Sequence, residues 1–137
     1  TAMGVSKDVP SLDIAYKLTE YAGHGRVKLS STRTVLAGRK QVFRLAQGSQ
    51  DVGDTIARAE EHLPGRPLLM PVMRGGYRLQ AVEVSLPQAQ AYAREQVARL
   101  PKALLALEKA AEPYPVAISP ALQEYQQETQ RRFSEED

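Results

Sequence analysis

Residues 40–45 have the sequence K-Q-V-F-R-L, in which every second side chain is expected on the same face. Gln41, Phe43 and Leu45 share one face, and the intervening residues share the other, which is typical of a β-strand. A turn is expected just before it, at Ala37-Gly38, because glycine accepts a positive φ at little cost. This stretch therefore predicts a short strand that begins after a turn.

The residues after this strand fit more than one structure. A polar, glycine-containing loop is expected from Gln47 to Gly53. Asp54 suits the N-cap of a helix over 54–61, but residues 54–58 also suit a strand that leads into a turn at 63–66. We favour the strand, because two turn signals at short spacing indicate a small β unit.

Further strands are predicted on both sides. Upstream, residues 13–21 alternate, a turn is expected at 22–25, and residues 26–30 return as the second strand of a hairpin. Downstream, residues 67–73 predict an edge strand, since they include a proline. A Gly75-Gly76 turn and a last strand over 77–84 follow.

The pattern becomes helical at Ser85. Ser85 is a favourable N-cap and Pro87 is tolerated in the first turn, so a helix is expected from here to Leu100, where Pro101 breaks it. A second helix is expected over 102–110. The apolar positions that recur at steps of three or four form one stripe: Leu86, Ala89, Ala93, Val97, Leu100 and Leu104.

The last segment repeats the same cap pattern. A short strand over 116–118 is expected, and then a helix that starts at Ser119-Pro120 and runs to about Phe133. The predicted fold class is α+β, with antiparallel β strands in the N-terminal half followed by a helical C-terminal appendage. We divide the chain into a β-rich segment (1–46), a small β unit (47–84) and a helical C-terminal region (85–137).

Composition narrows the class of protein. The chain of 137 residues has no Cys, which excludes a disulfide framework and a thiol nucleophile. No apolar run approaches the roughly 18 residues that a membrane span requires. We expect a cytoplasmic protein that binds no membrane. Residues 1–50 carry eight Lys or Arg and only three acids, so an anionic partner is expected there, although a solvated strand face explains the same charge.

Catalytic patterns are scarce. His24 and His62 have no second ligand at a metal-binding spacing and are interpreted as surface loop residues. There is no glycine-rich phosphate loop, and we expect neither a bound metal nor a nucleic-acid partner, because aromatic residues are too sparse among the basic strands. By themselves these residues indicate a soluble α+β domain.

Several strings are more specific than composition. P-S-L-D-I-A-Y-K-L at residues 10–18 resembles the pattern P-x-L-x-x-V-Y-K-L of nicotinate phosphoribosyltransferases. V-K-L-S at 27–30 and L-A-G-R-K-Q-V-F-R at 36–44 resemble the family's next strings. Segments 54–61, 67–73 and 114–119 are similar to later ones in the same order. The resemblance covers essentially the whole chain, and it places the chain in the C-terminal portion of the enzyme.

This resemblance implies an activity for a longer parent protein. Family members join nicotinate to the ribose phosphate of phosphoribosyl pyrophosphate, and ATP with Mg drives the reaction through a phosphorylated histidine. That histidine is expected upstream of Thr1, so no catalytic residue is assigned here. The 137-residue piece is expected to be inactive and to bind no cofactor. It is expected to form homo-oligomers, since strands lacking their partners would expose apolar surface.

Five residues are candidates for ligand contact by the same resemblance. Thr1 matches the threonine of a G-x-G-T turn that holds the ribonucleotide 5′-phosphate. Lys17, Lys28, Ser30 and Lys40 lie in family-like strings and are expected near ligand, where cations stabilise developing negative charge. Salt-bridged strand residues are the alternative for these four. Two other interpretations of the whole chain stay open, namely a free-standing oligomerisation or binding module and a small basic nucleic-acid binder.

Overall fold

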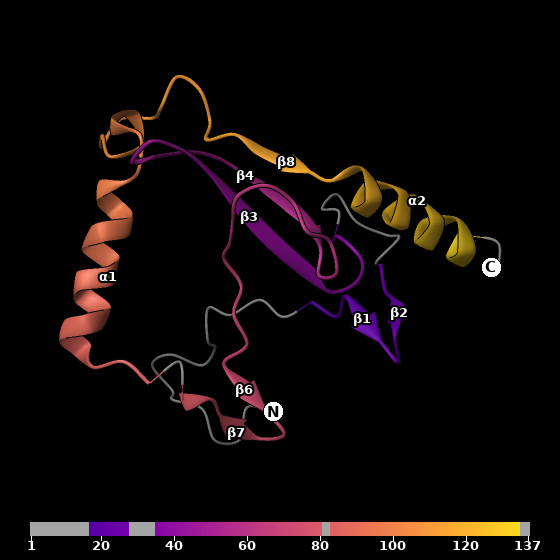
Figure 1. Cartoon of the computed structure of the whole chain (residues 1–137). Helices are drawn as coiled ribbons and strands as arrows, with labels where there is room; N and C mark the ends of the chain where they lie inside the picture. The colour runs from indigo at the N-terminus through magenta and orange to yellow at the C-terminus, as the bar shows by residue number, and fades with distance from the viewer. Residues whose placement is uncertain (1–16, 28–34, 81–82, 135–137) are drawn as a thin grey trace, which may run out of the picture.

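The computed structural model describes residues 17–27, 35–80 and 83–134. A sheet of four strands in the order β5-β3-β4-β8 forms its centre, and helix α2 follows β8 and contacts β4 (Figure 1). Two hairpins of two-residue strands and a second helix, α1, lie around this sheet. The α+β class with antiparallel strands in the N-terminal half and helices in the C-terminal half is confirmed.

The centre of the sheet is an antiparallel hairpin. Strand β3 (Lys40–Gln47) pairs with β4 (Gln50–Arg58), with a register shift between Leu45 and Ala46. Both the predicted strand over 40–45 and the preferred strand over 54–58 are confirmed. The predicted loop over 47–53 is wrong: Gly48, with φ of 59°, allows the chain to reverse in two residues and pair again at Gln50.

The other two strands join this hairpin at its two edges. Strand β5 (Arg66–Pro67) runs antiparallel to β3, and β8 (Val116–Ile118) runs parallel to β4. The short strand expected over 116–118 is confirmed. The sheet thus combines strands from all three segments into which the sequence was divided.

The strand predicted over 67–73 is mostly absent. β5 ends at Pro67, and the Leu68 amide still donates to the Val42 carbonyl at 2.8 Å. At Leu69 the side chain of Gln41 takes the place of the backbone ladder. Its Oε1 accepts from the Leu69 amide at 2.9 Å, and its Nε2 donates to the Leu69 carbonyl at 3.0 Å. Pairing resumes only in a hairpin of β6 (Met73–Arg74) and β7 (Tyr77–Arg78), across the predicted Gly75-Gly76 turn.

The N-terminal hairpin is shorter than predicted within the described residues. β1 (Glu20–Tyr21) pairs with β2 (His24–Gly25). Ala22 and Gly23 both have positive φ, 50° and 76°, as a tight two-residue turn requires, so the turn over 22–25 is confirmed. Residues 13–16 and 28–30 of the expected strands lie outside the described residues.

Helix α1 (Leu86–Ala98) begins as predicted. The Ser85 hydroxyl accepts from the Gln88 amide and the Gln88 side chain accepts from the Ser85 amide, which is a capping box. The prediction of a second helix over 102–110 is wrong. Only a 3₁₀ turn, η2 (Lys102–Leu104), forms after the extended Pro101, because the apolar side chains beyond it have no surface on which to pack.

Helix α2 (Pro120–Ser134) packs against β4 and confirms the predicted last helix. Ser119 caps it, since its hydroxyl accepts from the Leu122 amide at 3.1 Å. Leu122 is fully buried, and the remaining fully or nearly fully buried apolar side chains among the described residues are few: Ala37, Phe43 and Ala57. The core therefore lies between α2 and the β3–β4 hairpin.

Candidate functional site

The residues predicted to lie near ligand are only partly described by the structure. Thr1, Lys28 and Ser30 lie outside the described residues. Lys17 is exposed at the start of the described chain, before β1. Their roles stay predictions.

Lys40, the remaining candidate, points its ammonium group at the backbone. Its Nζ donates to the Leu36 carbonyl at 2.8 Å and to the Gly38 carbonyl. Burial lowers the pKa of Lys40, and the charge of Glu20 opposes that effect. These two hydrogen bonds hold the turn before β3 together, so in this structure Lys40 stabilises the entry to the sheet.

A denser cluster of charges lies at the tip of the β3–β4 hairpin. Arg44 and Asp54 are directly opposite each other across the hairpin. The Arg44 Nε donates to Asp54 Oδ1 and its Nη2 donates to Asp54 Oδ2, both at 2.8 Å. This two-pronged geometry is the strong form of an arginine–carboxylate pair. The bond from Arg44 holds the pKa of Asp54 below its ordinary value, and the same bond raises the pKa of Arg44.

A second carboxylate, that of Asp51, is fully buried beside this pair. The Arg99 guanidinium reaches Asp51 Oδ1 through Nη2 at 3.0 Å and through Nε at 3.1 Å. The Asp51 amide also donates to the Arg99 carbonyl at 2.9 Å. The backbone and the side chain of Asp51 therefore both bind Arg99, the C-cap of α1. They hold this end of the helix at the hairpin.

The other oxygen of Asp51 has a looser environment. Asp51 Oδ2 is buried and makes no hydrogen bond, although Arg44 Nη1 lies 3.7 Å away. We regard this contact as an ion pair without a direct hydrogen bond, because the distance exceeds hydrogen-bond range. Two arginines thus compensate the charge of this carboxylate.

Tyr114 closes the cluster from the segment before β8. Its hydroxyl donates to Asp54 Oδ1 at 3.2 Å, and the Arg44 guanidinium carbon lies 5.9 Å from the ring centre. Burial, followed by the charge of Asp54, raises the pKa of Tyr114. The hydroxyl therefore remains a donor at neutral pH.

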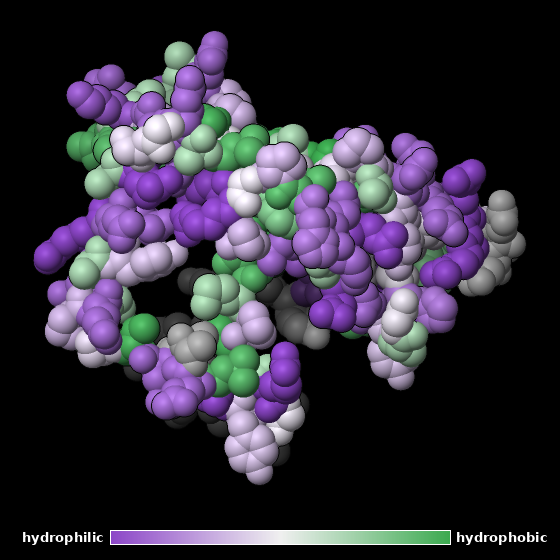
Figure 2. All heavy atoms as spheres, viewed as in Figure 1, coloured by the Kyte–Doolittle hydropathy of each residue, from purple (hydrophilic) through white to green (hydrophobic). Residues whose placement is uncertain are grey.

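A pocket of about 430 Å³ adjoins this cluster. Its described lining comes from the hairpin tip, β5 and the last turns of α1: Arg44, Ala46, Asp51, Gly65, Arg66, Glu95, Gln96 and Arg99. Figure 2 shows hydrophilic residues gathered where the end of α1 meets the hairpin.

The charges in this pocket are largely matched within the protein. Arg44 and Arg99 are held by Asp54 and Asp51, and Arg66 donates to the Gln96 side chain at 2.7 Å. Such a network positions the C-terminal end of α1 against the sheet. Sequence analysis missed it, because the cross-strand pairing of Arg44 with Asp54 depends on the two-residue turn at Gly48.

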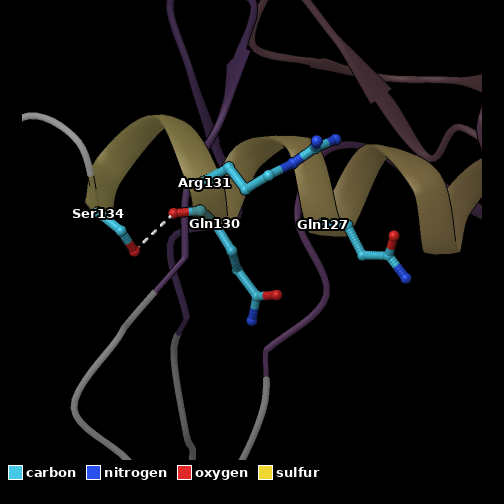
Figure 3. Close-up of a pocket in the computed structure, with 4 residues that line it drawn as sticks. All are labelled: Gln127, Gln130, Arg131 and Ser134. Atoms are coloured by element: carbon cyan, nitrogen blue, oxygen red, sulfur yellow. Dashed lines mark hydrogen bonds between the residues drawn. The ribbon is translucent and has the colours of Figure 1, made fainter.

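A second hollow lies on the outer face of α2. Figure 3 shows that its described lining residues, Gln127, Gln130, Arg131 and Ser134, all come from this one helix and that their side chains do not converge. The Ser134 hydroxyl donates to the Gln130 carbonyl at 3.0 Å. This face has no constellation that would perform chemistry.

The chain is similar to known proteins over most of its length. Residues 64–126 match the family model of the nicotinate phosphoribosyltransferase C-terminal domain. Two relatives named nicotinate phosphoribosyltransferase pncB2, from Mycobacterium tuberculosis strains CDC 1551 / Oshkosh and ATCC 25618 / H37Rv, are each 44% identical to the chain over 119 residues. The chain matches the C-terminal portion of the nicotinate phosphoribosyltransferases. The recognition made from the sequence strings is therefore confirmed.

The match to nicotinate phosphoribosyltransferases covers 87% of this chain but 26% of each relative, so the chain spans about a quarter of the curated relatives it matches. The C-terminal domain model begins at Pro64 and ends at Gln126. It therefore includes β5, α1 and β8, whereas the β3–β4 hairpin precedes it. The central sheet joins the nicotinate phosphoribosyltransferase C-terminal domain to the segment before it.

Two further findings concern the described residues of the chain. Within residues 17–27, 35–80 and 83–134, no group of three or more His, Asp or Glu side chains is placed to hold a metal ion. Over the same ranges, no helix is both long and apolar enough to cross a membrane.

Proposed function

We propose that this chain is the C-terminal part of an enzyme that makes nicotinate mononucleotide from nicotinate and phosphoribosyl pyrophosphate, coupled to ATP hydrolysis, in NAD salvage. The observation that carries the proposal is the 44% identity over 119 residues to proteins named nicotinate phosphoribosyltransferase. Over that length, such identity supports a common fold and a common parent reaction.

The chemistry itself is proposed to occur in the rest of the parent protein. His24 and His62 are both exposed, and His62 Nδ1 lies 3.1 Å from the Glu60 carbonyl, which is a local loop contact. Neither has a geometry that favours a phosphorylated histidine. The groups that bind ATP with Mg, and the histidine that ATP phosphorylates, are therefore proposed for the part outside this chain.

The contribution of this chain is proposed to be support at the edge of that site. Thr1 would donate to the 5′-phosphate, and Lys17, Lys28 and Ser30 would lie near the anionic ligand, where each cation or hydroxyl stabilises negative charge. Lys40 would support the site without contacting the ligand, because its ammonium group already donates to two backbone carbonyls. The parent is proposed to be a cytoplasmic homo-oligomer.

The test is to measure turnover by two proteins. The full-length protein and the 137-residue chain are each incubated with nicotinate, phosphoribosyl pyrophosphate, ATP and Mg, and nicotinate mononucleotide is quantified by chromatography. We expect product from the full-length protein only. A full-length protein that forms no product would refute the proposed reaction, and a 137-residue chain that forms product would refute the proposed division of labour.

A further inference from the structure

Arg66 carries a positive charge that no acidic side chain in the described part of the chain pairs with. Its Nη2 donates to the neutral side chain of Gln96 at 2.7 Å, and no described Asp or Glu forms an ion pair with its guanidinium. Arg66 is exposed in β5, so a molecule from solvent can reach it. This arginine is therefore available to an anion.

Arg66 also lies directly opposite a second arginine. It is the cross-strand partner of Arg44, so the two side chains lie on the same face of the sheet. Like charges in this arrangement destabilise a sheet. On its other side Arg44 faces Asp54, which binds it through two hydrogen bonds. This row across β5, β3 and β4 thus holds two cations and one anion.

A third arginine reaches the same place from the C-terminal end of α1. Arg99, Arg44 and Arg66 all line the pocket of about 430 Å³ described above, which we call the arginine pocket. The side chains of Arg44 and Arg99 are 21% and 28% exposed, whereas that of their partner Asp51 is 1% exposed. The acid thus lies deeper than the guanidinium groups, and the pocket presents the cations to solvent.

One exposed acid of the lining opposes this charge. Glu95 of α1 lines the arginine pocket and forms no ion pair with another described residue. The described lining therefore contains three arginines and two acids, of which only Glu95 is exposed. The positive charge exceeds the negative charge on the accessible side of the pocket.

The three arginines are already held in place by the protein. Asp54 holds Arg44, Gln96 holds Arg66, and Asp51 binds Nε and Nη2 of Arg99. Ordering a long side chain on binding costs free energy, and this cost falls where the side chain is fixed beforehand. The planar guanidinium has several N–H groups and suits the oxygens of phosphate. Prior ordering thus favours binding of such an anion.

We propose that the arginine pocket binds the phosphate group of a small molecule, with Arg66 as its main contact and Arg44 and Arg99 beside it. A tetrahedral phosphate has enough oxygens to accept from guanidinium groups that come from three different elements. Small-molecule sites have volumes of about 300–1,000 Å³, so the pocket has room for a phosphate ester as well as for free phosphate. This inference goes beyond the proposed reaction and does not depend on it.

A bound phosphate would join three elements that meet at this point. β5 supplies Arg66, β3 supplies Arg44, and Arg99 is the C-cap of α1. Figure 1 shows that the C-terminal end of α1 lies beside the turn between β3 and β4. Binding should therefore slow local opening at this end of the helix, since a ligand that binds only the closed form stabilises it.

The test is hydrogen–deuterium exchange of the full-length protein during titration with sodium phosphate, with ribose 5-phosphate, and with sodium chloride at equal ionic strength. At a phosphate concentration about ten times the titration midpoint, we expect amides in peptides covering 95–100 to become about tenfold better protected. Chloride should have no such effect. Equal midpoints for the two phosphates would assign the site to free phosphate, and a lower midpoint for ribose 5-phosphate would assign it to an ester.

Three variants connect this protection to the pocket. Arg66→Met should abolish the effect of phosphate, and Glu95→Gln should lower the midpoint about threefold, because it removes the one exposed negative charge of the lining. Arg78→Met is the matched control, since Arg78 is an exposed arginine of β7 outside the pocket, and it should leave the midpoint unchanged. Glu95→Gln keeps the test decisive even if Arg66→Met fails to fold.

Three results would overturn the proposal: no protection by phosphate, equal protection by chloride, or protection that persists in Arg66→Met with an unchanged midpoint in Glu95→Gln. Because exchange does not depend on turnover, the two proposals can fail separately. A full-length protein that phosphate protects but that forms no nicotinate mononucleotide would refute the reaction alone. An active protein without this protection would refute the phosphate site alone.

Discussion

The hydroxyl of Tyr125 accepts a hydrogen bond from the backbone amide of Gly25, at 2.8 Å, across 100 residues of sequence. The next residue, Gln126, accepts from the Ala37 amide at 2.7 Å and donates to the Val35 carbonyl at 3.3 Å. Side chains of α2 thereby satisfy backbone groups of the N-terminal segment. Helix α2 is held to this segment by directed hydrogen bonds as well as by Leu122 in the core.

Replacing Tyr125 with Phe should isolate the first of these bonds. The ring and its contact with the Arg58 guanidinium, 4.5 Å from the ring centre, remain, while the part-buried Gly25 amide loses its acceptor. We expect a loss of about 1 kcal/mol in the free energy of unfolding, measured by urea denaturation. Tyr92→Phe, on the exposed α1, is the control and should change nothing. Equal effects of the two substitutions would contradict the role of the bond.

Gly38→Ala should destabilise the protein more than Gly48→Ala. Both glycines have positive φ, 76° and 59°, so both substitutions carry the same backbone strain of about 1 kcal/mol. A Cβ on Gly38 would also lie 2.9 Å from Cε1 of Tyr125, whereas a Cβ on Gly48 meets nothing within 4 Å. We expect an additional loss of about 1–2 kcal/mol at Gly38 in urea unfolding. If the two variants unfold alike, Tyr125 does not pack as tightly as described.

Arg99→Met should remove the main partner of a buried carboxylate. Asp51 would keep only Arg44, at 3.7 Å, so we expect a loss of about 2–3 kcal/mol in the free energy of unfolding. Arg78→Met breaks the exposed pair with Glu83 and should have an effect below about 0.5 kcal/mol. Denaturation curves for both variants provide the measurement. A small effect of Arg99→Met would mean that the Asp51 charge is compensated in another way.

Asp54 should make stability depend on pH in the acid range. Its pKa is lowered in the folded protein, chiefly by the bond from Arg44, so the unfolded chain binds the proton more readily. Stability from this group is complete above the ordinary value of 3.8 and is lost as the pH falls through the lower folded value. Urea midpoints from about pH 7 to about pH 3 should decline less steeply for Asp54→Asn. If the urea midpoints of the unsubstituted protein and of Asp54→Asn decline with equal slopes, Asp54 is not the source of the pH dependence.

Ser119→Ala should destabilise the chain more than Ser85→Ala, although both residues cap helices. Ser119 is buried, caps α2 and donates to Glu61 Oε1 at 2.7 Å. We expect its loss to lower the free energy of unfolding of the 137-residue chain by about 1–2 kcal/mol. Ser85 caps α1, which packs on little in this chain, so thermal unfolding should barely change. The opposite order would indicate that α1 contributes more to the fold than its exposure implies.

The amino-acid sequence by itself determined the local features of this protein. The alternation over 40–45, the turns at Ala22-Gly23 and Gly75-Gly76 and the caps at Ser85 and Ser119 depend on neighbouring residues only, so they could be predicted and are confirmed. The ordered strings that resemble nicotinate phosphoribosyltransferases were also present in the sequence alone, and the family match confirms them.

Only the tertiary structure decided which distant groups meet. In the segment predicted as a strand over 67–73, the backbone groups of Leu69 bond to the side chain of Gln41 and not to a neighbouring strand. The predicted helix over 102–110 failed because no surface covers it. The clamp between Asp51 and Arg99 joins residues 48 positions apart, which no periodicity encodes. Burial and long-range hydrogen bonds override local preference in such places, because they add free energy that propensity alone does not supply.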